Sequence, residues 1–178
     1  MIEIEAGLRD ALARPAGPSS DFDLNPGIRP LAGTPLRPAA VLVPVWLRPE
    51  GAGVILTKRS SHLKHHPGQI AFPGGKVDAS DAGPEAAALR ETQEEIGLDP
   101  SRVQILGSLP VHETVTGFAI TPFVGLIRGP FSPIPEAGEV EEVFTVPLSH
   151  VLDSARFSIE RRQWMGVWRR YYAVPHGP

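Results

Sequence analysis

The order of apolar and polar residues divides the chain into a short helical lead and a longer body rich in strands. Near the start, apolar residues recur at the spacing of one helical stripe, as Ile4, Leu8 and Leu12. This stripe predicts a helix over residues 3–14, and the Pro-, Gly-, Ser- and Asp-rich residues 15–38 predict an extended connector. We therefore expect an N-terminal helix and connector over residues 1–37 and a main domain over residues 38–178.

Short apolar runs in the body predict five strands, at residues 39–47, 54–58, 103–109, 118–127 and 142–146. Residues 128–139 are rich in Pro and Gly and predict a surface loop, and residues 147–152 predict a helical turn. Basic and aromatic residues alternate over residues 162–174, which indicates a terminal hairpin. Strands mixed with a few helices imply an α/β or α+β sandwich.

The most informative segment is residues 75–98, which read GKVDASDAGPEAAALRETQEEIGL. Glu91, Glu94 and Glu95 follow the i, i+3, i+4 spacing that places three carboxylates on one face of a helix. The opposite side carries residues that can pack against a core, namely Leu89, Thr92 and Ile96. This pattern predicts an amphipathic helix with an acidic face.

Local signals mark both ends of this helix. Asp81 or Gly83 is placed to cap its start, and Pro84 suits its first turn. Gly97 is placed to end the helix in the left-handed conformation.

Like charges on one helical face repel each other, so the three glutamates need water or a cation around them. A solvated acidic face is the common outcome for Glu-x-x-Glu-Glu taken alone. The turn Phe72-Pro73-Gly74-Gly75 just ahead of the helix favours a second outcome, because glycines let the backbone approach a ligand or metal closely. A hard divalent cation with oxygen ligands would offset the repulsion.

Together these residues resemble the Nudix box of the Nudix hydrolases, G-x5-E-x7-R-E-U-x-E-E-x-G-U, in which U is aliphatic. The matching positions are Gly75, Arg90, Glu91, Glu94, Glu95, Gly97 and Leu98. Thr92 stands where an aliphatic residue is usual. The first glutamate of the pattern is absent, the loop is one residue longer, and Asp81 is the nearest acidic stand-in.

A second motif abuts the first. Residues 56–75, LTKRSSHLKHHPGQIAFPGG, resemble the extra signature of the coenzyme A diphosphatase branch, roughly L-L-T-x-R-[SA]-x3-R-x3-G-x3-F-P-G-G. Ile55 replaces the first Leu, and Lys64 replaces the internal Arg, which keeps the charge but loses bidentate phosphate recognition. The resemblance implies the Nudix fold, an α/β architecture with a mixed β-sheet sandwiched between helices.

The resemblance also implies a Mg²⁺ site, with Mn²⁺ able to replace that ion. Glu91 and Glu95 are its expected principal ligands. Glu94 is expected as a further ligand or as a catalytic base, and the Gly75 carbonyl is expected to complete the metal shell.

Roles outside the metal site follow in the same way. The expected general base is Glu139, ahead of Glu141, Glu142 and Glu113. Arg90 is expected to orient Glu91, and Arg59 and Lys64 are expected to pair with substrate phosphates.

Three functions remain open from the sequence. The favoured one is hydrolysis of the diphosphate of coenzyme A or its thioesters to 3′,5′-ADP and (acyl-)4′-phosphopantetheine. A second is a Nudix diphosphatase that acts on ADP-ribose, a dinucleotide or a damaged nucleoside triphosphate. The third is a non-catalytic Nudix scaffold that binds a nucleotide or a protein, which the three intact helical glutamates disfavour.

Two clusters admit other interpretations. The histidines at positions 62, 65 and 66 have no nearby Cys or Asp, so anion recognition or ordinary surface charge is favoured over zinc. The terminal aromatic and basic residues resemble a nucleic-acid stacking surface, but we expect a strand with one buried aromatic face instead, over Trp164, Trp168, Arg169, Arg170, Tyr171 and Tyr172.

Composition excludes several further classes. The 178 residues, 42% of them hydrophobic, suffice for one domain with a substantial core. The net charge of -3 disfavours a general nucleic-acid binder, and no apolar run reaches transmembrane length, so neither nucleic acid nor membrane is expected as a partner. The lack of cysteine excludes disulfides and thiol catalysis and is compatible with a cytoplasmic location.

Members of the resembled family usually continue beyond the segment that ends this chain into a helix that covers one face of the sheet. Because the chain stops at Pro178, we expect a longer chain, cover by the N-terminal segment, or cover by a second subunit in a homodimer.

Overall fold

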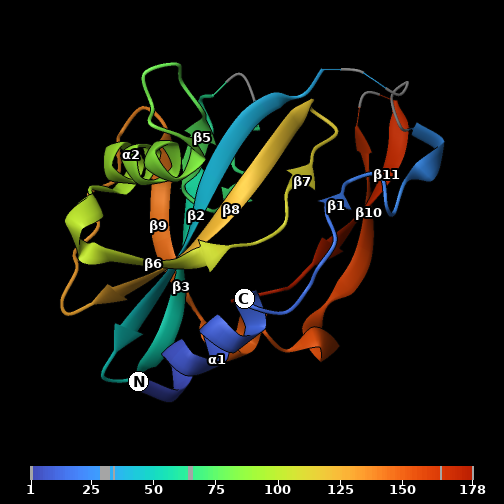
Figure 1. Ribbon diagram of the computed structural model, residues 1–178. Coiled ribbons are helices and arrows are strands. Elements are labelled where there is room, and N and C mark those ends of the chain that lie inside the picture. The colour runs from blue at the N-terminus through green and yellow to red at the C-terminus, as the bar shows by residue number, and fades with distance from the viewer. Residues whose placement is uncertain (1, 29–32, 34, 64–65, 165, 178) are drawn as a thin grey trace.

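The computed structural model describes residues 2–28, 33, 35–63, 66–164 and 166–177 (Figure 1). In this part, one mixed sheet contains β1 (Ser19–Ser20), β2 (Arg37–Arg48), β3 (Gly51–Arg59), β4 (Ile70–Ala71), β5 (Gly74–Lys76), β6 (Val103–Ser108), β7 (His112–Glu113), β8 (Phe118–Arg128) and β9 (Val140–Pro147). The α-helices are α1 (Ile2–Leu12), α2 (Pro84–Ile96) and α3 (Leu148–Val151). A separate hairpin joins β10 (Ser158–Trp164) to β11 (Val167–Ala173).

The two edges of β2 are used differently. One edge pairs in parallel with β8 over nearly the whole strand. The other edge pairs antiparallel with β5, where Val41 opposes Gly74, and further along with β3, where Val45 opposes Val54. The sheet therefore forks at this edge, and the Pro73 carbonyl accepts a 2.9 Å hydrogen bond from the Leu42 amide inside the fork.

Gly74 is required by this close pairing. Its φ of 146° lies in the region that side chains disfavour, and an added Cβ would collide with the Ala40 carbonyl and with Val41. The glycine thus lets the turn that begins at Phe72 lie directly against β2.

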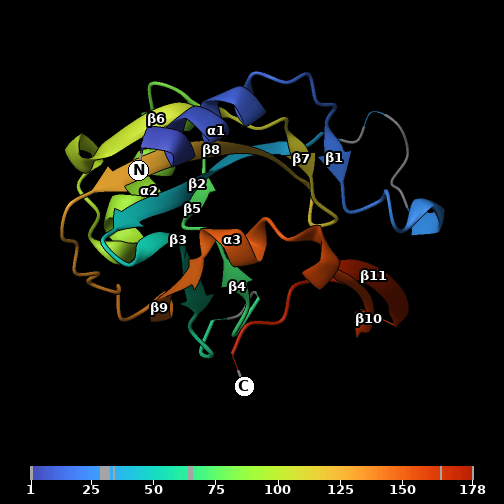
Figure 2. The ribbon, with the colours of Figure 1, turned by 90° about the horizontal axis from the view of Figure 1, so that it is seen from below.

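Helices cover both faces of the sheet (Figure 2). On one face α2 packs over β2 and β5, and the core there is built from Leu42, Ile55, Ile96, Leu98, Ile127 and Phe131. On the other face α1 and α3 pack around Val45 and Leu126, with α1 presenting the predicted stripe of Ile4, Leu8 and Leu12. The predicted α/β architecture, a mixed sheet between helices, is confirmed.

Most predicted elements are present with shifted ends. The helix predicted over residues 3–14 ends at Leu12, and the strand predicted over residues 39–47 extends over Arg37–Arg48. The short strands β1, β4, β5 and β7 were not predicted, because two or three residues carry no periodic pattern. The division of the chain at residues 37 and 38 stays a prediction.

The expectation of a buried aromatic face on the terminal hairpin is wrong. Trp168 and Tyr172 are 60% and 61% exposed, and Tyr171 is 44% exposed. The physical reason is that β10 and β11 pair only with each other, apart from the main sheet, so the described elements supply no layer over these rings (Figures 1 and 2). The hairpin is attached at its edge by Asn25, which donates to the Arg170 carbonyl and accepts from the Arg170 amide.

Among the helices of the described residues, none combines the length and the apolar character needed to cross a membrane.

Candidate active site

Helix α2 begins and ends at the predicted signals. Gly83 is its N-cap without a capping side chain, and Pro84 opens the first turn. At the other end Gly97 adopts the left-handed conformation with φ 71°, and its amide donates to the Gln93 carbonyl. Of the two predicted caps, Gly83 therefore takes the position, which leaves the Asp81 side chain free for another contact.

The core-facing side of α2 includes one of the acidic residues. Thr92 and Ile96 are buried as predicted, and the Thr92 hydroxyl donates to the Ala88 carbonyl at 2.6 Å, which satisfies the group that replaces the usual aliphatic residue. Leu89 packs beside the core as well. Glu95 lies on the same buried side and is only 5% exposed. A carboxylate in that position needs a partner.

Glu95 receives partners from both arms of the fork. The Gly74 amide donates to one carboxylate oxygen at 3.1 Å, and Arg59 Nη1 lies 3.9 Å from the other. Burial raises the pKa of Glu95 to about 7, and the charges of Glu91 and Glu139 add to this rise, whereas Gly74 and Arg59 oppose it. The carboxylate is therefore held in a position where more positive charge would stabilise its ionised form.

Arg90 holds the acidic face together. It donates to Asp81 through Nε at 2.9 Å and Nη2 at 3.0 Å, and its Nη1 reaches both Glu91 and Glu94 at 3.0 Å. The hydrogen bond from Arg90 lowers the pKa of Asp81 below its ordinary value. Glu94 is 59% exposed, while the Asp81 side chain is 6% exposed. The predicted contact of Arg90 with Glu91 is thus present, and Asp81 is occupied as the partner of Arg90.

Gly75 lies directly against Glu91. An added Cβ on Gly75 would fall 2.5 to 2.8 Å from the atoms of the Glu91 carboxyl group, which is closer than a real side chain allows. The absence of a side chain at position 75 therefore lets the Glu91 carboxylate approach the backbone of the turn. Burial raises the pKa of Glu91, opposed by Arg90 and supported by the charges of Glu94 and Glu139.

The segment after β8, residues 129–139, lacks regular structure but is attached to the end of α2. The Ile134 amide donates to the Ile96 carbonyl at 2.9 Å, and the Glu136 amide donates to the Glu95 carbonyl at 2.9 Å. These bonds satisfy carbonyls that the last turn of a helix leaves without internal partners. The loop therefore runs across the helix end, which its Pro- and Gly-rich sequence did not indicate.

Glu139 closes this loop beside the acidic helix. Its carbonyl accepts a 2.8 Å hydrogen bond from the Ser60 amide, which ties the loop to the end of β3. The Glu139 side chain is exposed. The pKa values of Glu91 and Glu95 are raised mainly by their own burial, and the negative charge of Glu139 adds to this rise. The charge of Glu139 thus acts on Glu91 and Glu95, although Glu139 is distant from both in the sequence.

The three reserve carboxylates for the base differ from Glu139. Glu141 is engaged by Lys58 at 2.6 Å and by the Ser61 amide at 3.2 Å. Glu142 lines a separate groove, and Glu113 lies on β7. Neither is among the charges that raise the pKa of the helical glutamates.

Arg59 and Lys64 were predicted to bind phosphates. The backbone of Arg59 is fixed, because its amide donates to the Gln69 carbonyl at 2.9 Å and its carbonyl accepts from the Gly68 amide at 3.1 Å. Its side chain is 28% exposed and points toward Glu95. Lys64 lies outside the described residues.

The donor set suits a hard divalent cation. It consists of oxygen ligands, which Mg²⁺ and Mn²⁺ accept, and it includes the buried Glu95 and the close approach of Glu91 to Gly75. In the described part of the chain, no three or more acidic or imidazole side chains are already gathered into a ligand cage. Instead the three glutamates of the acidic cluster each face an arginine, because Arg90 contacts Glu91 and Glu94 and Arg59 contacts Glu95.

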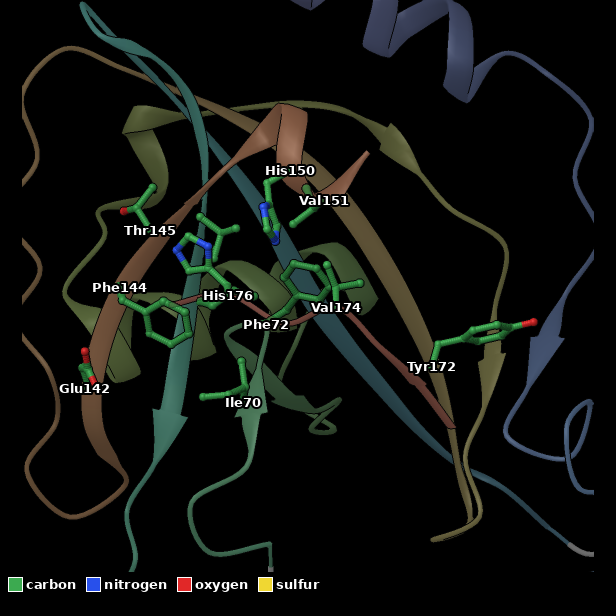
Figure 3. Close-up of a pocket in the computed structure, with 12 residues that line it drawn as sticks. Ile70, Phe72, Glu142, Phe144, Thr145, His150, Val151, Tyr172, Val174 and His176 are labelled. Carbon is green, nitrogen blue, oxygen red and sulfur yellow. The ribbon is translucent and has the colours of Figure 1, made fainter. Parts of the chain in front are cut away.

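A groove of about 820 Å³ lies on the side of the sheet that carries α3 (Figure 3). Figure 3 shows Ile70 and Phe72 inside it, with Phe144 on one side and Tyr172 on the other. Glu142, a reserve candidate for the base, lines this groove, whereas none of the expected metal ligands does. The candidate active site is therefore defined by its charged groups and not by this groove.

Comparison with protein families matches the NUDIX domain to residues 36–166, which is most of the chain. The chain therefore belongs to the Nudix family, and its fold and acidic helix are those of a Nudix hydrolase. The resemblance seen in the two motifs is confirmed.

Curated relatives are similar over most of their length. The Uncharacterized Nudix hydrolase NudL of Enterobacter sp. (strain 638) is 45% identical over 144 residues, which cover 76% of this chain and 74% of the relative. The protein of the same name from Escherichia coli (strain K12) is 43% identical with the same coverage. Among solved structures, the Nudix hydrolase RenU of M. smegmatis is similar with a TM-score of 0.56 and 25% identity, over 67% of this chain and 76% of that chain.

Proposed function

We propose that this Nudix hydrolase cleaves the diphosphate of coenzyme A or its thioesters in a Mg²⁺-dependent reaction, with Mn²⁺ able to replace Mg²⁺. Water attacks one phosphorus and expels the other half, which gives 3′,5′-ADP and (acyl-)4′-phosphopantetheine. The observation that carries this proposal is the position of Arg59, which belongs to the coenzyme A signature and contacts Glu95 of the Nudix helix. One residue of each motif thus meets at the same point.

Glu91, Glu94 and Glu95, with the Gly75 carbonyl, would hold the metal ion. Nudix hydrolases generally use divalent metal ions, and such an ion would neutralise diphosphate oxygens and lower the pKa of a water molecule. Arg90 keeps Glu91 and Glu94 oriented, and Asp81 keeps Arg90 in place. The remaining step is removal of a proton from the attacking water.

Glu139 is the proposed general base. Its side chain is exposed, and its loop is fixed to the Glu95 and Ser60 backbones. A base on this loop can accept the proton of the attacking water while the helical glutamates stay with the cation. Glu141 suits the role less, because Lys58 and the Ser61 amide already occupy its carboxylate.

Arg59 and Lys64 are the proposed phosphate-binding residues. Arg59 is partly exposed beside the acidic cluster, so its guanidinium can reach an anion held there. The 3′-phosphate of coenzyme A is a second anion that these cations would recognise.

The test is a hydrolysis panel with coenzyme A, acetyl-CoA, NADH, ADP-ribose and 8-oxo-dGTP, with Mg²⁺ present or removed and with products identified. We expect Mg²⁺-dependent release of 3′,5′-ADP from coenzyme A or acetyl-CoA. Rapid turnover of ADP-ribose or 8-oxo-dGTP without turnover of either coenzyme A compound would refute the substrate while keeping the Nudix chemistry.

A comparison of coenzyme A with 3′-dephospho-CoA tests whether the protein recognises the 3′-phosphate. We expect the compound without the 3′-phosphate to be the poorer substrate, with the difference reduced in Arg59→Ala or Lys64→Ala. A lost charge-assisted contact corresponds to roughly a 10- to 150-fold decrease in kcat/KM. Equal rates on both compounds would remove the 3′-phosphate from the recognised groups.

A further inference from the structure

The two guanidinium groups at the acidic cluster are held very differently. Arg90 makes hydrogen bonds to Asp81, Glu91 and Glu94, all between 2.9 and 3.0 Å, and is fixed in one orientation. Arg59 approaches Glu95 only to 3.9 Å, which is an electrostatic contact beyond hydrogen-bond length. Arg90 is therefore held by several hydrogen bonds, whereas the contact of Arg59 with Glu95 is electrostatic alone.

The backbone directs Arg59 to this position. Lys58 opposes Glu142 across the β3–β9 pair, but Arg59 opposes Val140, so Glu141 is the extra residue of a bulge. Bulges next to active sites change the direction of side chains. Here Lys58 is paired with Glu141, and the next residue, Arg59, is left to face Glu95.

The carboxylate that Arg59 faces has little other compensation. Glu95 is 6% exposed in its side chain, and the Gly74 amide is the hydrogen-bond donor that the structure gives it. A divalent cation bound to Glu95 would repel a guanidinium at 3.9 Å, since both carry positive charge. The guanidinium and the cation therefore compete for one carboxylate.

We propose that Arg59 is an exchangeable counter-cation, which balances Glu95 in the metal-free protein and turns to the substrate diphosphate once a divalent cation takes Glu95. This proposal rests on the metal site of the proposed function and adds a second role to Arg59. The protein thereby keeps a buried carboxylate balanced without a metal ion. It also directs the Arg59 guanidinium toward the diphosphate only after the divalent cation has bound.

The proposal predicts effects of opposite sign for one substitution. In Arg59→Gln, Mn²⁺ binding without nucleotide becomes tighter by about 2- to 10-fold, because a competing charge is removed. Binding of ADP, used as a diphosphate probe at saturating Mn²⁺, becomes weaker by about tenfold. A residue that only contacts substrate would leave the first value unchanged, and a purely structural residue would weaken both.

Isothermal titration with Mn²⁺ alone, and then with ADP, measures both affinities. Lys58→Gln is the matched control. It removes the same charge from the residue next to Arg59, and the Lys58 side chain is paired with Glu141 and not with Glu95. We expect its Mn²⁺ affinity to stay within about twofold of wild type. Arg59→Lys keeps the charge, so it should restore wild-type Mn²⁺ affinity but recover ADP binding only in part.

Unchanged or weaker Mn²⁺ binding in Arg59→Gln, with a wild-type melting curve, overturns the exchange. Glu95→Gln distinguishes this failure from failure of the metal site itself. If Glu95→Gln loses Mn²⁺ binding while Arg59→Gln does not change it, only the exchange is wrong. If Glu95→Gln also binds Mn²⁺ as wild type does, the metal site and the exchange are both wrong.

Discussion

Asp81 and Arg90 meet through two hydrogen bonds, from Nε to Oδ1 at 2.9 Å and from Nη2 to Oδ2 at 3.0 Å. The same guanidinium contacts Glu91 and Glu94, so a carboxylate in the loop before α2 fixes the orientation of two carboxylates on the helix. Asp81 stands close to the position where the Nudix pattern has its first glutamate. Its contact with Arg90 gives the acidic group of this loop a supporting function.

Asp81→Asn should therefore lower the activity without removing any proposed metal ligand. The amide cannot accept both hydrogen bonds from Arg90, and loss of such a supporting partner typically costs about 10- to 100-fold in metal affinity or activity. Hydrolysis rates measured across a Mg²⁺ titration would show this loss of metal affinity or activity. Asp78→Asn is the control, since Asp78 is 62% exposed and lies 3.6 Å from Arg90. Equal effects of the two substitutions would argue against the support by Asp81.

Glu95→Gln should abolish most turnover and leave the fold intact. The amide is nearly isosteric with the carboxylate but cannot neutralise a cation, and the loss should be on the order of 10³-fold in rate. Without metal the variant should melt no lower than wild type, because a buried carboxylate with a pKa of about 7 becomes a neutral group. Steady-state rates at saturating Mg²⁺ and thermal melts check both expectations. Glu85→Gln, in the first turn of the same helix, serves as the control. Near-normal turnover of Glu95→Gln would exclude it as a ligand.

Glu139→Gln should reduce kcat more than it reduces metal affinity. A general base contributes roughly 10²- to 10⁴-fold to the rate, whereas the loop itself is held by backbone bonds that the substitution keeps. Rates measured across a Mg²⁺ titration separate the two effects. A variant that loses Mg²⁺ affinity but recovers full kcat at saturation would make Glu139 a ligand instead. Glu136→Gln is a useful comparison in the same loop.

His112 connects the N-terminal segment to strand β7 of the sheet. His112 on β7 contacts the Ser19 hydroxyl at 2.8 Å through Nδ1 and the Asp21 carboxylate at 3.2 Å through Nε2. The hydrogen bond to Asp21 raises the pKa of His112 above its ordinary value, against the effect of burial, and the charges of Asp23 and Glu113 support the rise. Protonated His112 therefore stabilises the attachment of residues 19–21.

The contribution of His112 to stability should fall as the pH rises above the ordinary pKa of a histidine, about 6.5. Because the folded-state pKa of His112 is raised, its contribution is fully present below the unfolded value and is lost as the pH passes the folded value. Urea unfolding at several pH values would measure this fall, which should be smaller in His112→Gln. The same pH dependence in both proteins would assign it to other groups.

The sequence predicts the parts of the site whose signals are local. The acidic face of α2, its Pro84 start and its Gly97 end all lie within one short segment, and each appears as expected. The burial of Glu95 is different, because helical spacing alone groups it with the exposed Glu94. The burial of Glu95 depends on the fork beside β2, and the fork depends on the pairing of β2 with both β3 and β5.

Contacts between distant segments explain the other differences. Ser19 opposes His112 in a parallel pair of two-residue strands, which no periodicity can reveal. The hairpin was predicted from residue 162, but it begins at Ser158 because that residue pairs with Ala173. Its aromatic residues have the alternation of a half-buried strand, yet burial requires a second layer that the described elements do not supply.

The loop of residues 129–139 has a consequence for hydrogen exchange and for protein engineering. Since the Ile134 and Glu136 amides bond to the carbonyls at the end of α2, they should exchange with solvent as slowly as amides of a helix end, although they lie in an irregular surface segment. The Glu95 main chain thereby fixes the loop that ends at Glu139. Insertions between Glu136 and Val140 would move the Glu139 carboxylate relative to Glu95. This loop should therefore tolerate substitution far better than a change of length.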